Sequence, residues 1–244
     1  MNETLAAIMD SAFQVPLTAL VLTWFAFEIG RWLQVRCGGS ALANSVLIAS
    51  VLLIVALRFA HVSYASYMQG AGFIHFLLGP AAVALAVPIY DNLDRIRDSA
   101  ASILAAIAAG ATIAATAAVG IAWALGASPD VVRSIAPKSV TTPIAIGISQ
   151  EIGGYQAMTV VFVIITGILV AMLCGRFFDL IGVRESEARG IAAGVTGHGI
   201  ATAQMLATSQ TAAAFAALAM GLTALFSAFL LPIVARLLPA MPSG

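Results

Sequence analysis

The chain has 244 residues, of which 61% are hydrophobic and 9% are charged, and its formal net charge at pH 7 is zero. Soluble domains carry roughly 25% charged residues, so this composition excludes an ordinary soluble protein and predicts a membrane protein. The absence of a basic tract argues against nucleic acid as a partner. Cys37 lies near an expected loop and Cys174 inside an apolar run, so neither a disulfide framework nor a metal site is expected, and no cofactor is expected.

Charged residues occur in short clusters that separate long uncharged runs. These runs cover residues 37–57, 59–90, 99–129, 152–175 and 190–235. About 20 apolar residues cross the hydrocarbon core of a bilayer, so several runs must cross it, and the last is long enough to cross twice. The sequence therefore predicts an all-α, polytopic transmembrane helical bundle that forms a single domain over residues 1–244.

In chain order, the hydropathy pattern predicts helices over residues 12–30, 41–60, 73–90, 99–126, 156–178, 185–206 and 210–238. Between the second and third, the segment HVSYASYMQGAG (61–72) predicts a short helix lying at the membrane interface, because His61, Tyr64 and Tyr67 recur every third residue. A further helix start is predicted at Ser128-Pro129-Asp130, where a capping serine precedes a proline.

Basic residues cluster at 31–36, 95–97 and 176–189. All three clusters face the cytoplasm if the N-terminus lies outside and the segment 137–152 enters the membrane and returns on one side. As a helix that segment would be only about 24 Å long, shorter than the hydrocarbon core of roughly 30 Å. A re-entrant or broken span is therefore expected there.

Prolines and glycines interrupt three apolar segments. A proline inside a helix removes a backbone donor and clashes with the preceding turn. Breaks or hinges are expected at Gly79, Pro80, Pro88, Pro137, Pro143, Gly194, Gly197 and Gly199. Freed backbone groups are costly in lipid, so such segments must be buried in protein or line a wet cavity.

Secondary transporters use broken helices, since the N-termini of half-helices carry partial positive charge and face anionic substrate groups. On this interpretation helix N-termini near Pro80 and Pro143 bind an anion. The alternative is that the prolines only kink packed helices. The stretches VALAVPI (83–89) and VTTPI (140–144) both end in Pro-Ile, which suggests duplicated halves, residues 1–126 and 127–244.

Lys138 is the most informative charge in the segment PKSVTTPIAIGISQEIGG (137–154). It lies at an expected helix start, where the helix dipole already disfavours a cation. A bound carboxylate would satisfy Lys138 and the nearby amides together. Three hydroxyls able to bind the hydroxyl or keto oxygen of a small acid follow it, on Ser139, Thr141 and Thr142. The alternative is that Lys138 extends to the lipid headgroups.

His198 is the only ionisable group between residues 190 and 235. Its pKa near neutrality suits a proton carrier or a substrate ligand, and Thr196 and Thr202 could add contacts. The alternative is a buried histidine bonded to a backbone carbonyl. Glu151, at the far end of the segment that contains Lys138, is a second candidate for coupling, with a solvated helix end as its alternative.

At these residues the chain resembles the CidB/LrgB family of membrane proteins. The resemblance is carried by SYASYMQGAG (63–72), LLGPAAVALAVPIYDNL (77–93), GASPDVVRSIAPKSVTTPIAI (126–146), IGGYQAMTVVFVIITGIL (152–169), ARGIAAGVTGHGIATA (188–203) and FAALAMGLTAL (215–225). Two departures occur: the family's ASHGIGTA element has Gly197 and Ala201 here, and an early Asn-Pro pair is Asn44-Ser45. The first departure leaves the exact substrate undetermined.

The resemblance implies two functions. One is transport of small monocarboxylates such as glycolate, glycerate or pyruvate, because one member is half of a plastid glycolate/glycerate translocator. The other is antiholin-like regulation of murein hydrolase export and cell lysis, together with a small CidA/LrgA-type membrane partner. The resemblance also implies a multi-pass protein of the bacterial inner membrane, related to transporters with broken helices and inverted repeats.

The sequence therefore predicts a secondary transporter of 2-hydroxy or 2-keto monocarboxylates that works by alternating access and is coupled to protons or ions. An elevator-like carrier of this kind is expected to be a homodimer. An enzyme is not expected, since the serine-protease-like stretch Gly147-Ile148-Ser149 has Glu151 where a glycine is required.

Overall fold

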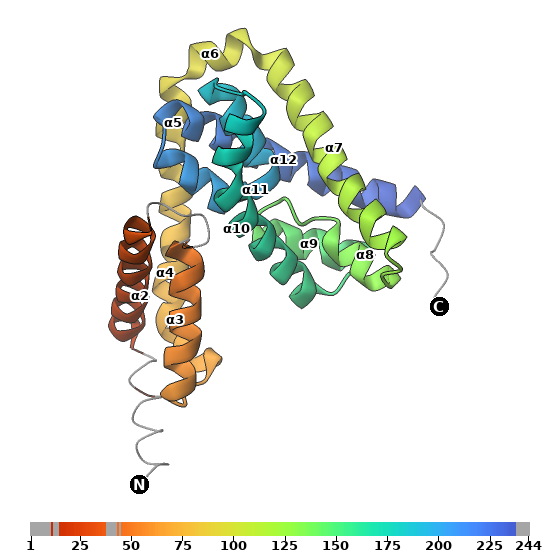
Figure 1. The fold of residues 1–244 in the computed structure, drawn as a ribbon. Helices are drawn as coiled ribbons and strands as arrows, with labels where there is room; N and C mark the ends of the chain where they lie inside the picture. The colour runs from red at the N-terminus through yellow and green to blue at the C-terminus, as the bar shows by residue number, and fades with distance from the viewer. Residues whose placement is uncertain (1–10, 12–14, 38–42, 44, 238–244) are drawn as a thin grey trace. The chain divides into compact units, whose positions relative to one another are not determined.

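The structure is a computed structural model that describes residues 11, 15–37, 43 and 45–237. The secondary-structure elements of six or more residues in that part of the chain are all α-helices, and the described residues contain no β-strand (Figure 1). They form two compact units, divided between Ala84 and Leu85. The predicted all-α class is confirmed. The expected helix starts at residues 12 and 41, and the departure at residue 44, lie outside the described residues.

The first unit contains, in its described part, α2 (Pro16–Arg36), α3 (Ser45–Phe59) and α4 (Tyr64–Ala84). α2 packs against both α3 and α4. It continues past Gly30, where the sequence predicted its end. A Cβ atom at Gly30 would lie 2.5 Å from the carbonyl oxygen of Ser45, so this glycine permits a close helix crossing rather than ending a helix.

The structure contradicts the predicted break at Gly79-Pro80 and the separate interfacial helix over residues 61–72. α4 is continuous from Tyr64 to Ala84 with Pro80 inside it. One proline removes one backbone donor, and a helix with intact turns on both sides continues through that defect. The interruption falls at Leu85 instead.

The predicted interfacial segment is part of the core of the first unit. Tyr67 is 9% exposed and packs with Ala19, Val62 and Ala71. Its hydroxyl oxygen lies 2.8 Å from Oγ1 of Thr23 on α2. A tyrosine spaced for the membrane surface is here held inward by a hydrogen bond between two helices.

The second unit contains the remaining described helices: α5 (Ala86–Asp91), α6 (Leu93–Asp98), α7 (Ala100–Ala124), α8 (Pro129–Ile135), α9 (Thr142–Ile152), α10 (Gln156–Leu180), α11 (Ser186–Leu206) and α12 (Gln210–Leu237). α8 and α9 form a short helical hairpin, with α8 against α7 and α10, and α9 against α10 and α12 (Figure 1). α11 packs between α10 and α12 and also touches α7.

Three helices of the second unit are long and apolar enough to cross a membrane, over Ala100–Ala124, Gln156–Leu180 and Gln210–Ala235. Large apolar side chains remain exposed along them, for example Ile113, Ile165 and Phe229. Such exposure is unfavourable in water and favourable against lipid tails. The protein is therefore a membrane protein, as the composition predicted.

Small residues set the spacing of α11 and α12. A Cβ atom at Gly190 would lie 2.3 Å from the backbone oxygen of Ala212, and one at Gly194 would lie 2.2 Å from that of Ala216. Both contacts are shorter than any side chain tolerates, so the two backbones touch. Gly194, predicted as a hinge, lies within the helical part of α11 and serves this contact.

We predict that Gly194→Ala destabilises the protein by roughly 1–3 kcal/mol, because the added methyl group collides with the backbone of Ala216. Thermal unfolding in mild detergent measures this loss. Gly120→Ala on α7 is the matched control, since no atom lies within 4 Å of its added Cβ and alanine favours helix by about 1 kcal/mol. Equal melting temperatures for the two variants would contradict the packing role.

Candidate functional site

The hairpin of α8 and α9 begins where the sequence predicted a helix start. Ser128 is the N-cap of α8 and Pro129 occupies its first turn. Pro137 lies in the turn that separates α8 from α9. Thr141, in an extended conformation, is the N-cap of α9, and Pro143 lies in its first turn, where a missing amide hydrogen removes no helical bond.

Buried hydroxyl groups hold this hairpin against the start of α10. The hydroxyl of Thr159 lies 2.9 Å from the carbonyl oxygen of Ser134 and 2.7 Å from the hydroxyl of Ser149. The hydroxyl of Ser134 accepts a hydrogen bond of 2.7 Å from the amide of Tyr155. Ser134, Ser149 and Thr159 are fully buried, and none was predicted as functional. Their local sequence gives no signal of this role, because the role depends on the elements that pack around each hydroxyl.

Lys138 lies in the turn before α9 and is the only lysine of the chain. It is half-buried, and its ammonium group donates a hydrogen bond of 3.3 Å to the hydroxyl of buried Ser139. Each ion pair found in the described part of the chain involves an arginine, so Lys138 has no carboxylate partner there. Nor do the amides of Thr141 and Thr142 have an acceptor within those residues. A positive charge and free amide donors therefore lie within five residues of one another, without a carboxylate partner in the described part of the chain.

The break in α11 falls at His198. Its φ of 41° and ψ of −138° are non-helical, and a positive φ is rare for a residue with a side chain. The glycines at 197 and 199 flank it. The hydroxyl of Thr202 donates a hydrogen bond of 2.8 Å to the carbonyl oxygen of His198. The helix is thus interrupted at the histidine itself, between its two predicted glycine hinges.

The imidazole of His198 is buried against α10. Its Nε2 lies 3.0 Å from the carbonyl oxygen of Val163, and since a carbonyl only accepts, Nε2 carries the proton and Nδ1 is the acceptor nitrogen. A Cβ atom at Gly167 would lie 2.7 Å from Cε1 of this ring, and one at Gly197 would lie 2.6 Å from Cγ1 of Val170. Glycine at both positions makes room for the break. Gly167 was not identified from the sequence.

Val163 links the hairpin to the broken helix. Its side chain, fully buried, packs with Ala136, Val140 and Ala145 of the hairpin, while its carbonyl oxygen binds His198. The structure therefore brings the hairpin that carries Lys138 and Ser139, and the helix break that carries His198 and Thr202, to Val163 of α10.

Other predicted residues lie elsewhere. Pro80 belongs to α4 in the first unit, and Pro88 lies in α5. Glu151 is exposed in the last turn of α9, about 14 Å along the helix axis from its N-terminus. The hydroxyl of Thr196 donates to the carbonyl oxygen of Ala192 at 2.8 Å. Thr196 lines a cavity that does not include Lys138.

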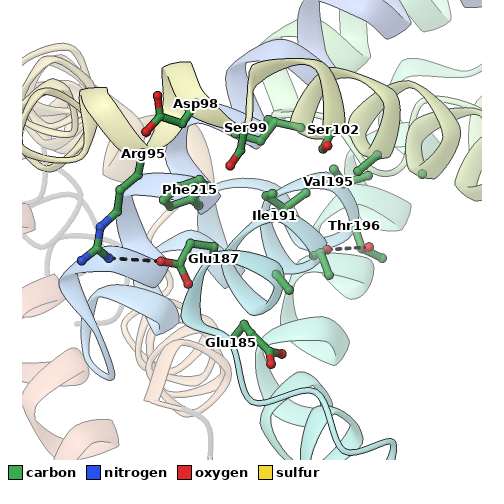
Figure 2. A pocket seen from close by; sticks show the side chains of 15 residues that line it. Arg95, Asp98, Ser99, Ser102, Glu185, Glu187, Ile191, Val195, Thr196 and Phe215 are labelled. Atoms are coloured by element: carbon green, nitrogen blue, oxygen red, sulfur yellow. Dashed lines mark hydrogen bonds and ion pairs between the residues drawn. The ribbon is translucent and has the colours of Figure 1, made fainter.

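A cavity of about 760 Å³ lies between α6, α7, α11 and α12 (Figure 2). Its polar lining residues are Arg95, Asp98, Ser99, Ser102, Glu185, Glu187 and Thr196. Arg95 forms an ion pair of 3.1 Å with Glu187, drawn dashed in Figure 2. The cavity does not include Lys138, but it reaches Thr196, two residues before His198. Its ionic lining was not predicted as part of a site.

Comparison with known proteins gives one family. The model of the LrgB-like family matches residues 23–237. A Bacillus subtilis (strain 168) protein named "Uncharacterized protein YxaC" is 38% identical over 189 residues, which is 78% of this chain and 82% of that protein. "Holin-like protein CidB" of Staphylococcus epidermidis is 30% identical over 234 residues, 96% of this chain and 98% of that protein. No solved structure matches the chain.

A second protein named "Holin-like protein CidB", from Staphylococcus aureus (strain Mu50), is 32% identical over 218 residues, 89% of this chain and 95% of that protein. The region matched by the family model includes both the hairpin of α8 and α9 and the break at His198. The resemblance seen in the sequence motifs is thereby confirmed. The chain belongs to the LrgB-like family.

Proposed function

We propose that this protein is a multi-pass secondary transporter of the bacterial inner membrane that carries small 2-hydroxy or 2-keto monocarboxylates by alternating access. The observation that carries the proposal is Lys138. A half-buried ammonium group without a counter-ion among the described residues, beside the free amides at the start of α9, is a site that an anion completes.

The hydrogen-bond donors of the proposed site favour a small acid. The hydroxyl of Ser139 is held next to the ammonium group of Lys138, and the amides of Thr141 and Thr142 follow on the same turn. These donors suit a carboxylate, which accepts several hydrogen bonds at once. The hydroxyls of Thr141 and Thr142 remain to bind a second oxygen, as a 2-hydroxy or 2-keto acid provides. The family resemblance supports glycolate, glycerate and pyruvate as the first candidates.

His198 is proposed to couple transport to protons. It lies in a helix break, its Nε2 is bound to Val163, and Nδ1 is the nitrogen that can accept a proton. The cavity in Figure 2 has one arginine and three carboxylates in its lining, a balance that attracts cations and repels anions. We therefore assign it to the coupling ion rather than to the acid. Glu151 remains a weaker candidate for the same role because it is exposed.

A second candidate function is antiholin-like regulation of murein hydrolase export and lysis with a CidA/LrgA-type partner. It is favoured by the names of two relatives, which are called holin-like. A regulator of this kind needs neither an anion at Lys138 nor a proton at His198. A lysis phenotype that persists in Lys138→Ala and His198→Ala would support it over the carrier.

We predict that proteoliposomes containing the protein take up labelled glycolate or pyruvate, and that Lys138→Gln lowers this uptake at least about tenfold. A hydrogen-bonded charge contributes roughly 1.5–3 kcal/mol, and 1.4 kcal/mol corresponds to a factor of ten. Arg97→Gln is the matched control, because it also removes one positive charge but from an exposed position on α6. Folded wild-type protein that takes up neither acid, with and without its small partner, would contradict transport.

We also predict that bound acid protects Lys138 from amine-reactive reagents. Because the chain has no other lysine, acylation of its side-chain amine is read from a single peptide by mass spectrometry. Saturating glycolate or pyruvate should slow the acylation, while neutral ethylene glycol at the same concentration should not. Equal rates under all three conditions, in protein that is active in uptake, would place the acid away from Lys138.

A further inference from the structure

Thr223 on α12 carries a buried hydroxyl that nothing in the described structure satisfies. The residue is 1% exposed, and its Oγ1 is the one buried side-chain nitrogen or oxygen in the described residues without a hydrogen-bond partner. Burying a hydroxyl without a partner is unfavourable, so native proteins contain few such groups. This one therefore needs an explanation.

Other hydroxyls in the helices form a hydrogen bond within their own helix. A serine or threonine inside a helix commonly donates to the carbonyl oxygen four residues earlier. In this protein that bond is made by Thr23, Ser50, Thr112, Thr116, Ser134, Thr196 and Thr202. Thr223 does not make it to the carbonyl oxygen of Ala219, although both lie within α12. Its hydroxyl is left available for a partner outside its own helix.

The neighbours of Thr223 along α12 contact elements of the proposed site. One turn before it, Sδ of Met220 lies 4.0 Å from the hydroxyl of Thr202, just beyond the break in α11. The following residue, Ala224, packs in the cluster that contains Val163 and Val140. Thr223 therefore lies on the part of α12 that runs from the broken helix to the hairpin.

Thr223 also lies at the middle of the apolar span Gln210–Ala235. Substrate sites of secondary transporters lie near the bilayer midplane, and polar groups at that depth are costly unless they serve a function. The buried hydroxyl is thus at the depth that alternating access requires.

We propose that Thr223 is a further ligand-binding residue, which hydrogen-bonds the 2-hydroxy or 2-keto oxygen of the transported acid in addition to the hydroxyls of Thr141 and Thr142. This inference rests on the proposed transport function. The cationic group of Lys138 and the free amides suit the carboxylate, whereas a threonine hydroxyl is neutral and both donates and accepts. It therefore matches a neutral oxygen, which is a donor and acceptor in a 2-hydroxy acid and an acceptor in a 2-keto acid. Met220, a flexible neighbour, can move to admit the ligand.

The role assigned to Thr223 is selectivity. A site built to hydrogen-bond a substrate oxygen discriminates against the analogue that lacks it. Acetate has the carboxylate of glycolate but no 2-oxygen. The preference of the carrier for glycolate over acetate should therefore depend on the hydroxyl of Thr223, while the binding of the carboxylate should not.

The test measures the half-saturation concentrations for glycolate and acetate uptake in proteoliposomes. Thr223→Val replaces the hydroxyl with a methyl group of similar size and should raise the glycolate value about tenfold while changing the acetate value less than about twofold. Thr223→Ala should do the same, and Thr223→Ser, which keeps the hydroxyl, should retain the preference. Thr112→Val on α7 is the matched control, since its hydroxyl bonds only its own helix, and it should leave both values unchanged.

Stability in the absence of substrate separates binding from a structural role. Removing an unsatisfied buried hydroxyl should leave the melting temperature of Thr223→Val equal to or above that of the wild type, whereas losing a structural hydrogen bond would lower it. Wild-type glycolate preference that persists in the Val and Ala variants overturns the inference and leaves transport standing. A lowered melting temperature with equal losses for both acids overturns it too. Wild-type protein that takes up no acid overturns the proposed function and this inference together.

Discussion

The close approach of α10, α11 and α12 is the constraint on which the rest of the second unit depends. Lipid tails are as apolar as the helices, so burial of apolar surface does not drive helices together inside a bilayer. Contact between backbones does so instead, and it requires glycine at the crossing points. Gly190 and Gly194 provide this backbone contact toward α12, and Gly167 leaves room for the ring of His198. A side chain at Gly190 or Gly194 would separate α11 from α12, and one at Gly167 would displace the imidazole of His198 from the carbonyl of Val163.

Helices that are interrupted inside the bilayer leave backbone groups that lipid cannot satisfy. The protein satisfies some of them with its own hydroxyls: Thr159 binds the carbonyl of Ser134, and Thr202 binds the carbonyl of His198. Elsewhere it does not. Within the described residues, the ammonium group of Lys138 has no carboxylate partner and the hydroxyl of Thr223 has no hydrogen-bond partner. The satisfied groups hold the fold, and the unsatisfied ones lie where we place the ligand.

The sequence was sufficient for the long helices and for two of the three breaks. Uncharged runs of more than 20 residues predict α7, α10 and α12 because the bilayer imposes that length. The predicted helix break at Pro80 was wrong, because intact turns on both sides continue the helix through the proline. The predicted interfacial position of Tyr67 was also wrong, because its hydroxyl pairs with Thr23 from another helix. Thr159, Gly167 and Thr223 were missed for one physical reason: their roles depend on the element that packs against each of them. No local pattern carries that information.

The unsatisfied groups also bear on the choice between a carrier and a regulator. A buried group without a partner lowers stability, and a protein that never binds a ligand gains nothing from keeping one. A carrier does gain, since a ligand that binds the native state stabilises it in proportion to the logarithm of its concentration relative to the dissociation constant. In the transport that we propose, the same groups would also release the ligand on the other side of the membrane. A bond within the protein, such as that between Lys138 and Ser139, would then weaken ligand binding enough for turnover. If these groups were purely structural, we would expect Lys138 to pair with a fixed carboxylate. We would also expect the hydroxyl of Thr223 to donate to the carbonyl oxygen four residues earlier in its own helix.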